Sequence, residues 1–308
     1  IEHQLFKELK KRKAEVDTLE FRKRAQAYAL KFVDVQREEF KRLGVLGDWQ
    51  KPYLTLSREY EYWILKSFAR LVAQGYIYRG RKPVNWCVEC ETALAEAEVE
   101  YEDHTSPSVY VKFKVNNPQE IPGIPTDKPL SLLIWTTTPW TLLANAAVAV
   151  HPAYTYLIID AGKEIVVAEE SLWVKSIREK FGFNFAQTVS SVNEGEKILA
   201  FIKGDKLKGL VYTHPFGLKE NCPVITTDYV TREDGTGLVH TAPGHGQEDY
   251  EAGQMYKLDM LMPVDDCGIF TREAGAFAGQ HVFKANDRII ADLRHRCLLY
   301  TSPSPRDR

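Results

Sequence analysis

The stretch SVYVKFKV, residues 108–115, decides the fold class of this 308-residue chain. Apolar side chains at every second position from Val109 to Val115 alternate with Ser, Tyr and Lys, which predicts a half-buried strand. A helix is predicted near residues 172–181. Further apolar, β-branched runs surround it, separated by turn residues, at 130–136, 147–150, 154–159, 165–168, 198–202 and 224–230. Many short strands at this spacing predict a barrel or a compact mixed sheet.

The first 80 residues carry a helical pattern instead. Residues 20–43 predict an amphipathic helix that ends at Gly44 in a left-handed cap, and a second helix begins after Ser57 and ends at Gly75. The apolar stripes of the two helices are Phe21, Ala25, Tyr28, Phe32, Val35 and Leu43, and Tyr60, Ile64, Phe68 and Leu71. We therefore expect a domain boundary near residue 90.

Composition narrows the function classes. The chain is 44% hydrophobic and 27% charged, as expected of a globular protein, and it has no apolar run long enough to span a membrane. Its first residues lack the apolar core of a signal peptide, and the missing initial Met suggests an upstream part. The five cysteines, an odd number, favour a reducing compartment. Residues 1–90 have an excess of Lys and Arg, which suits either a polyanion such as RNA or a solvated helical surface.

The first motif with chemical potential is LIWTTTPWTLLAN, residues 133–145. Three threonines, Thr136, Thr137 and Thr138, stand at a strand end, and Pro139 disfavours helix for the residue before it. Such a turn can present several hydroxyl and backbone N–H groups, which suits binding a ribose or orienting a water molecule. The alternative is that these are ordinary β-branched strand residues before a proline turn.

The second motif is DGTGLVHTAPGHGQEDY, residues 234–250. Its first four residues predict a tight turn into a strand that carries His240. Glu248 and Asp249 are expected to open the next helix, where the helix dipole favours carboxylates. The alternatives are a loop histidine at His245 and a structural helix-start acid at Asp249, but the density of polar residues favours a site.

The third motif, WCVEC, contains Cys87 and Cys90. A CxxC pair is half of a tetrahedral zinc site, and no second close pair follows, so zinc binding is expected to be incomplete. Phosphate-binding loop, GxGxxG, HExxH and GxSxG motifs do not occur in the sequence. Residue types alone thus indicate a soluble mixed domain with a polar Thr/His/Asp cluster.

At these motifs the sequence resembles isoleucyl-tRNA synthetase of the bacterial type. Residues 134–145 resemble that family's threonine-rich editing motif, and residues 235–250 resemble its second editing motif. Residues 40–55 and 82–101 resemble the segments that flank the editing insertion. The similarity runs to about Arg296. The valyl enzyme has a related layout, but its editing motif is closer to TTRPET than to TTTPWT, so the equivalent piece of a valyl-tRNA synthetase is the near alternative.

The resemblance implies an α/β fold: part of a Rossmann-like class I nucleotide-binding domain, mostly its inserted helices, followed by a β-barrel-rich mixed α/β editing domain. The expected boundaries are 1–92 for the catalytic part and connection, 93–285 for the editing domain, 286–297 for the return to the catalytic domain and 298–308 for an aberrant or disordered tail. The chain departs from the family at Leu143, where Pro is usual. The family's HIGH and KMSKS signatures, which hold ATP, are expected outside this chain.

The resemblance also implies an activity. The family joins isoleucine to tRNA(Ile) with ATP and Mg, and its editing site hydrolyses mischarged valyl-tRNA(Ile) without a cofactor. Aminoacylation is not expected from this chain alone. The implied catalytic residues are Thr136, Thr137, Thr138, His240 and Asp249. The implied substrate-binding residues are Trp135, Asn145, Gly235, Thr236, Gly237 and His245.

Motif position assigns the roles. Asp249 is expected to pair with the substrate α-ammonium group, and His240 to limit the size of the side-chain pocket, with a general base as its alternative role. The expected partners are the acceptor end of tRNA(Ile) and valyl-tRNA, with no DNA and no membrane. We expect a monomeric parent in the cytoplasm or an organellar matrix. A non-catalytic tRNA-binding fragment is the alternative from another functional class.

Overall fold

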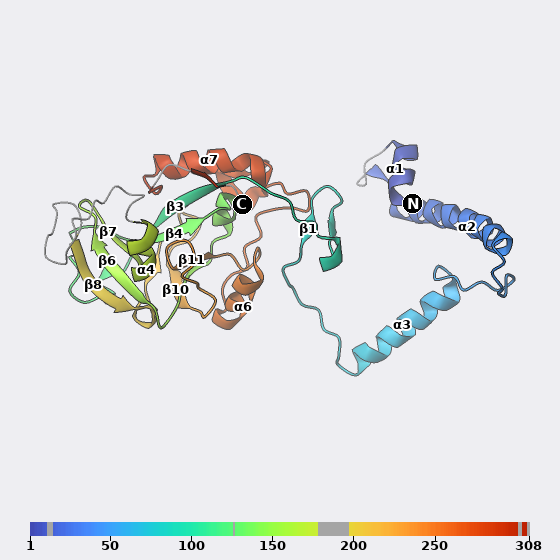
Figure 1. Ribbon diagram of the computed structural model, residues 1–308, viewed down its shortest axis with the longest axis horizontal. Helices are drawn as coiled ribbons and strands as arrows, with labels where there is room; N and C mark the ends of the chain where they lie inside the picture. The colour runs from blue at the N-terminus through green and yellow to red at the C-terminus, as the bar shows by residue number, and fades with distance from the viewer. Residues whose placement is uncertain (11–14, 126, 178–196, 301–303, 307–308) are drawn as a thin grey trace. The chain divides into compact units, whose positions relative to one another are not determined.

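The computed structural model describes residues 1–10, 15–125, 127–177, 197–300 and 304–306 (Figure 1). The chain divides into two compact units, Ile1–Gly80 and Arg81–Arg308, which are described separately. The boundary expected near residue 90 and the boundaries implied by the resemblance stay predictions.

The first unit is helical, as predicted, with α1 (Glu2–Leu9), α2 (Thr18–Arg42) and α3 (Arg58–Ala73). The Ser57 side chain accepts a hydrogen bond from Tyr60 N at 3.3 Å, which caps α3. Gly44 follows α2 with φ 76°, and the next amide, of Val45, donates back to Phe40 O at 3.0 Å. The predicted start of α3 after Ser57 and the predicted end of α2 at Gly44 are therefore confirmed.

The apolar stripes of α2 and α3 are not buried within this unit. Neither helix has a buried residue, and Phe32 and Phe68 are 39% and 51% exposed. The main aromatic contact between α1 and α2 is the stack of Phe6 on Phe21, with ring centroids 4.8 Å apart. The amphipathic pattern predicted the helices correctly, but three helices alone do not cover these stripes.

The second unit contains two larger sheets and the hairpin of β1 (Trp86–Cys87) and β2 (Thr92–Ala93). The six-stranded sheet has the order β12 (Ser304–Arg306), β3 (Ser106–Lys114), β4 (Leu130–Thr136), β7 (Ile165–Glu169), β6 (Thr155–Asp160), β8 (Lys197–Lys203). The four-stranded sheet has the order β11 (Leu238–Thr241), β5 (Ala147–Val150), β10 (Cys222–Thr226), β9 (Val211–Tyr212).

The mixed α/β class is confirmed, but the expected barrel is wrong over the described residues. Both sheets are open, because each strand order has two ends that do not pair with each other. The spacing of apolar runs along the sequence predicts how many strands there are. It does not predict whether the first and last strands pair to close a barrel. Within the run 224–230, only the part up to Thr226 is strand.

The core lies between the sheets and the helices that cover them. Helix α7 (Val282–His295) buries Ala285, Ile289 and Leu293 in the main apolar cluster, together with residues of β3 and β4. The 3-10 helix η4 (Pro139–Ala144), which follows β4, contacts α7 and buries Leu142 and Leu143. Helix α6 (Gln247–Tyr256) follows β11, with its residue Ala252 in a smaller cluster. The residues after β4 and after β11 meet where the ring of Trp140 packs on that of His245, with centroids 5.0 Å apart.

Two further expectations concern segments next to this core. A short helix α4 (Glu170–Leu172) and a π-helical turn (Trp173–Ile177) occupy the start of the helix predicted at 172–181, and the rest lies outside the described residues. Residues 298–308 were expected to form an aberrant or disordered tail that buries little. At its start, however, Leu298 and Leu299 pack against the main core, and Lys112 N donates to Leu298 O at 2.9 Å.

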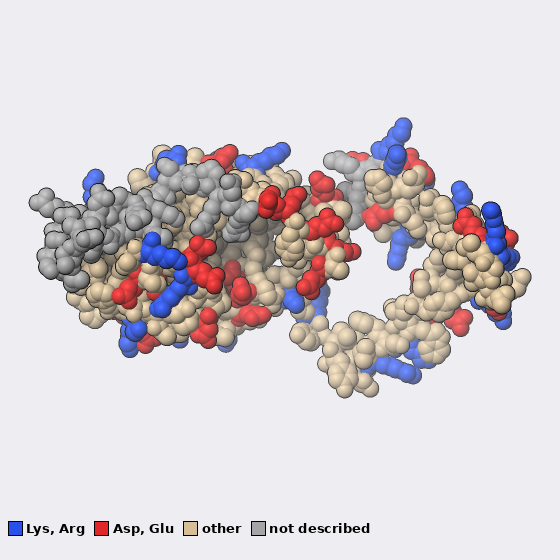
Figure 2. Space-filling view, in the orientation of Figure 1, with Lys and Arg blue, Asp and Glu red and all other residues tan. Residues whose placement is uncertain are grey.

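The visible face of each unit carries charges of both signs. Figure 2 shows blue and red side chains on both units, with a group of Asp and Glu side chains around the β1–β2 hairpin. The basic excess of residues 1–90 is therefore not gathered into one patch on this face. Among the described residues, no helix is long and apolar enough to cross a membrane.

Candidate active site

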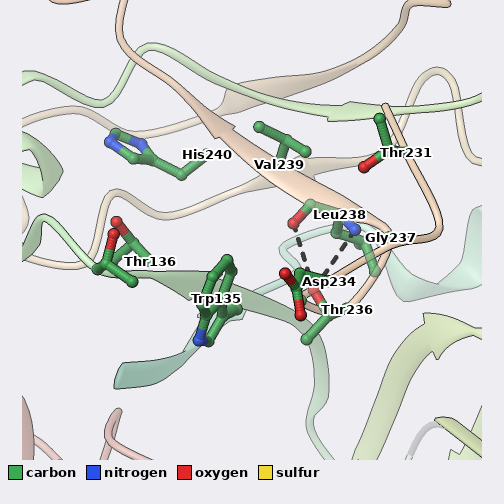
Figure 3. A pocket seen from close by; sticks show the side chains of 11 residues that line it. Trp135, Thr136, Thr231, Asp234, Thr236, Gly237, Leu238, Val239 and His240 are labelled. Carbon is green, nitrogen blue, oxygen red and sulfur yellow. Dashed lines mark hydrogen bonds between the residues drawn. The ribbon is translucent and has the colours of Figure 1, made fainter. Parts of the chain in front are cut away.

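A pocket of about 260 Å³ lies between the end of β4 and the turn that leads into β11. Figure 3 shows Trp135 and Thr136 on one side, and Val239 and His240 on the strand opposite them. The lining residues are Trp135, Thr136, Thr137, Thr231, Asp234, Gly235, Thr236, Gly237, Leu238, Val239 and His240. The two motifs, about a hundred residues apart in sequence, thus meet in one pocket because β4 lies against β11.

The turn 234–237 depends on its two glycines. Gly235 has φ 85° and Gly237 has φ 73°, a backbone region that other residues rarely adopt. A Cβ on Gly235 would lie 3.1 Å from Cε3 of Trp135, so the turn packs directly on the indole face. The indole is fixed from its other edge, because Trp135 Nε1 donates to Ser108 Oγ at 2.7 Å. Residue types predicted this tight turn correctly.

An ion pair supports the residues before the turn. Arg232 Nε lies 2.9 Å from Oε1 of Glu169, which is 1% exposed at the end of β7. The Arg232 guanidinium also lies 3.8 Å from the ring centroid of Tyr154. Behind the turn, Tyr156 Oη donates to Gly237 O at 2.8 Å. The pocket wall is thus connected to β6 and β7.

The threonines end β4 as predicted. Thr136 Oγ1 accepts a hydrogen bond from Thr138 N at 3.0 Å, and Thr138 O accepts one from Thr141 Oγ1 at 2.8 Å. Thr136 and Thr137 line the pocket, whereas Thr138 is not among its lining residues. The hydroxyl of Thr136 is therefore shared between holding the turn and facing the pocket.

His240 closes one wall of the pocket and is 9% exposed. Its Nδ1 lies 2.8 Å from Asn145 Nδ2, and its Nε2 lies 3.1 Å from Thr141 Oγ1. Burial, together with the smaller effect of the nearby His214 and His245, lowers the pKa of His240 to about 3. The imidazole is consequently neutral at pH 7.

Three other predicted residues, Asn145, His245 and Asp249, are wholly or partly withdrawn from solvent. Asn145 is fully buried. Asp249 Oδ2 accepts from Ala242 N at 3.0 Å and Asp249 Oδ1 accepts from Tyr229 Oη at 3.4 Å. Burial raises the pKa of the Asp249 carboxyl. None of Asn145, His245 and Asp249 is among the residues that line this pocket.

The pocket also contains residues that the sequence did not single out: Thr231, Asp234, Leu238 and Val239. Asp234 was predicted only as a turn residue, yet it lines the pocket, and Figure 3 shows it near Trp135 and Thr236. The position of Leu238 and Val239 on a strand was predicted, but strand alternation alone did not show which part of β11 faces the pocket.

The cysteine pair offers two thiols and no complete metal site. Cys90 N donates to Cys87 Sγ at 3.4 Å, and a third thiol, that of Cys267, lies 3.6 Å from Glu91 Oε1. No group of three or more His, Cys, Asp or Glu side chains that could hold a metal occurs among the described residues. These donors do not fit a four-coordinate zinc ion.

Comparison with known proteins gives the family. The profile of the tRNA synthetases class I (I, L, M and V) matches residues 1–278, which is most of the chain. The chain belongs to the class I tRNA synthetases.

Two curated relatives of this synthetase chain are isoleucine–tRNA ligases. The ligase of Moorella thermoacetica is 47% identical over 296 residues, 96% of this chain and 30% of the relative. The ligase of Fervidobacterium nodosum is 48% identical over 294 residues, 95% of this chain and 30% of the relative. The chain spans about 30% of the length of the relatives it matches. The predicted resemblance to isoleucyl-tRNA synthetases is confirmed.

Among solved structures, the editing domain of the P.knowlesi cytosolic leucyl-tRNA synthetase has a TM-score of 0.49 and 12% sequence identity, covering 67% of this chain and 100% of that one. The structure named GlLeuRS-CP1 has a TM-score of 0.48 and 15% identity, covering 64% of this chain and 100% of that one.

Proposed function

We propose that the pocket hydrolyses the ester of valyl-tRNA(Ile), the mischarged product of an isoleucine–tRNA ligase. The observation that carries the proposal is the composition of the pocket: hydroxyls of Thr136 and Thr137, a carboxylate at Asp234, and a neutral, doubly hydrogen-bonded imidazole at His240. The threonine hydroxyls suit a ribose and a water molecule, and the fixed ring suits a steric limit.

The reaction needs positioning more than a strong base. A water oxygen attacks the carbonyl carbon of the aminoacyl ester, the bond to the ribose oxygen breaks, and the ribose oxygen takes up the proton. Because the ester is already activated, holding water and carbonyl in reach of each other supplies much of the rate. No covalent enzyme intermediate and no cofactor takes part.

Selection rests on a difference of one methylene between valine and isoleucine. A pocket that binds the larger side chain gains only roughly 1–3 kcal/mol from that group; the handling of isoleucine and valine by this enzyme family is itself the standard example. We propose that His240 excludes isoleucine by occupying the space its extra methylene needs. Asp249 is proposed to pair with the α-ammonium group, and the turn 234–237 to hold the terminal adenosine with Trp135.

The remaining assignments belong to the complete ligase. We propose that it attaches isoleucine to tRNA(Ile) with ATP and Mg, as a monomer in the cytoplasm or an organellar matrix. Residues 1–92, 93–285 and 286–297 are proposed to belong to its catalytic, editing and returning catalytic segments. tRNA is the partner of this chain, through its acceptor end. The hydrolysis itself uses neither ATP nor a metal.

The test is deacylation of two substrates, valyl-tRNA(Ile) and isoleucyl-tRNA(Ile), by the chain and by its His240→Ala variant. We expect the parent chain to release valine and spare isoleucine, and the variant to release both. Binding of valyl-tRNA(Ile) without release of valine by the parent would favour the non-catalytic tRNA-binding alternative. A parallel fall of both rates in the variant, by roughly two to four orders of magnitude, would instead make His240 a general base.

A further inference from the structure

We propose that Asn145 and Tyr212 are positioning residues that lock the His240 imidazole in its Nε2–H tautomer, so that the ring is a fixed wall and has no lone pair available to accept a proton. The proposed tautomer is a property of the chain without substrate and does not depend on the proposed function. Its consequence for substrate selection rests on the proposed editing function.

The orientation of the Asn145 amide follows from its neighbours. One terminal atom lies 2.9 Å from Ala147 O, a carbonyl that can only accept, so this atom is the nitrogen Nδ2. The other terminal atom, Oδ1, accepts the hydroxyl proton of Tyr212 at 2.5 Å. A flipped amide would set two oxygens against each other at Ala147. The side chain is fully buried, so no water replaces these partners within the fold.

The orientation of Asn145 then determines the tautomer of His240. Asn145 Nδ2 has two protons, one directed to Ala147 O and one to His240 Nδ1, 2.8 Å away. Nδ1 must therefore be the accepting nitrogen. Since a neutral imidazole carries one proton, that proton is on Nε2, where it is donated to Thr141 Oγ1 at 3.1 Å. Burial lowers the pKa of His240 to about 3, in agreement with a neutral ring.

The hydrogen bonds consequently run in one direction. They start at the Tyr212 hydroxyl and pass through Asn145, His240 and Thr141 to end at Thr138 O, which Thr141 Oγ1 contacts at 2.8 Å. Every donor has an acceptor and no proton is left over. Such a fully satisfied buried network holds its members in one arrangement.

Tyr212 anchors this network in the core. Its ring is fully buried and packs on Phe113, with centroids 5.0 Å apart. Burial raises the pKa of its hydroxyl well above the ordinary value, so the group remains a donor at any relevant pH. Through Asn145, the hydroxyl thus connects β9 to the pocket wall on β11, at the other end of the same four-stranded sheet.

The arrangement of Thr141, His240 and Asn145 has the order of a hydroxyl, an imidazole and an orienting side chain, as in nucleophilic hydrolases. Its polarity is reversed. In those enzymes the orienting group accepts from the ring and the ring accepts from the hydroxyl, whereas here Asn145 donates to the ring and the ring donates to Thr141. Thr141 is not activated, and His240 cannot remove a proton from water.

The tautomer can be observed directly by nitrogen–proton correlation spectra of the chain with 15N-labelled histidine, with His240→Asn to assign the signal. We expect the parent to show the Nε2–H form at pH 7. Asn145→Asp leaves only acceptors beside Nδ1, so the Nδ1–H or doubly protonated form should replace it. A parent spectrum with the Nδ1–H or charged form overturns the proposal, whether or not Asn145→Asp folds. A folded Asn145→Asp chain that keeps the Nε2–H form also overturns it.

Tyr212→Phe removes only the hydroxyl and leaves Asn145 Oδ1 without its donor. The loss of one buried hydrogen bond is expected to raise the ratio of isoleucyl- to valyl-tRNA(Ile) hydrolysis about tenfold, because the wall is held less firmly. Tyr256→Phe is the matched control: its hydroxyl bonds Thr226 O at 2.7 Å, away from this network, so the ratio should not change. An unchanged ratio in Tyr212→Phe overturns the role of Tyr212. If no variant or parent hydrolyses either ester, the proposed function fails while the spectra still decide the lock.

Discussion

Gly237 lies against the side chain of Glu169, and a Cβ added at Gly237 would collide with the Cβ of that glutamate. The two segments are also joined by a hydrogen bond from Glu169 N to Thr236 O at 2.8 Å. The turn that lines the pocket is thus seated on the end of β7, and its position depends on a residue without a side chain.

Gly237→Ala should therefore displace the turn and lower the stability of the second unit by roughly 3 kcal/mol or more, through left-handed strain and the collision with Glu169. Gly217→Ala is the matched control, because Gly217 has nearly the same φ, 72° against 73°, and open space around its Cβ. It should lose only about 1 kcal/mol. Denaturant unfolding measures the free energy of unfolding of both variants. Equal decreases would show that backbone strain alone, without the collision with Glu169, destabilises Gly237→Ala.

Substitution can separate the contributions of the Asp249 and Asp234 carboxylates to hydrolysis. Asp249→Asn should lower kcat/KM for valyl-tRNA(Ile) by about 10–100-fold, the value of one charged hydrogen bond to the α-ammonium group. It should weaken tRNA binding far less, because phosphate contacts dominate affinity. Asp234→Asn makes the same chemical change in a residue that lines the pocket. A larger loss in Asp234→Asn would transfer the anchoring role to that residue.

The free energy of unfolding of the chain should decrease as the pH is lowered below 6.5. Burial lowers the pKa of His214 and His245 to about 4 and that of His240 to about 3, whereas unfolded histidines titrate near 6.5. Below pH 6.5 the unfolded chain therefore binds more protons, and each histidine costs up to about 1.4 kcal/mol per pH unit. The raised pKa of Asp249 acts in the opposite direction.

Denaturant midpoints measured from pH 7.5 to 5 check this expectation, because carboxylates of ordinary pKa stay largely ionised there. His214→Gln should reduce the slope of the denaturant midpoint against pH by the contribution of one bound proton. A flat profile in the parent would mean that the three rings are accessible to protons in the folded state.

Leu299→Ala should destabilise the second unit by about 1–2 kcal/mol, because the side chain is only partly buried against the core. Removing residues 297–308 should cost more, since it also deletes the backbone bond between Tyr300 N and Tyr110 O at 2.9 Å. Thermal melting of both variants measures the effect. An unchanged melting temperature after truncation would restore the view that this segment buries little.

Zinc should bind weakly, with no change in melting temperature. Cys87 and Cys90 supply two thiolates, and the ion would take its remaining ligands from water. Metal analysis after dialysis is the measurement, with Cys87→Ser as the control. One zinc ion retained per chain, and lost in Cys87→Ser, would contradict the expectation.

The sequence predicted those features that depend on a few neighbouring residues. Gly235 and Gly237 marked the turn because few other residues adopt its φ angles, and Pro139 marked the end of β4. Pocket membership depends on pairing between distant strands, so Thr231 and Asp234 were missed. His245 and Asp249 were placed in the site by motif position, and neither is among the residues that line this pocket. The chain leaves β11 at Thr241, and Asp249 lies on α6, which begins at Gln247.

The hydrogen bond between Asn145 and His240 joins residues 95 positions apart, and β5 pairs with β11 over a similar separation. Such pairings form late, because closing a long loop costs entropy before any contact repays it. On the ribosome, β4 and β5 are synthesised well before β11, so their apolar faces stay exposed until β11 has been made. A nascent chain that stops short of His240 has no pocket at all, and its unpaired strand edges are then open to other chains.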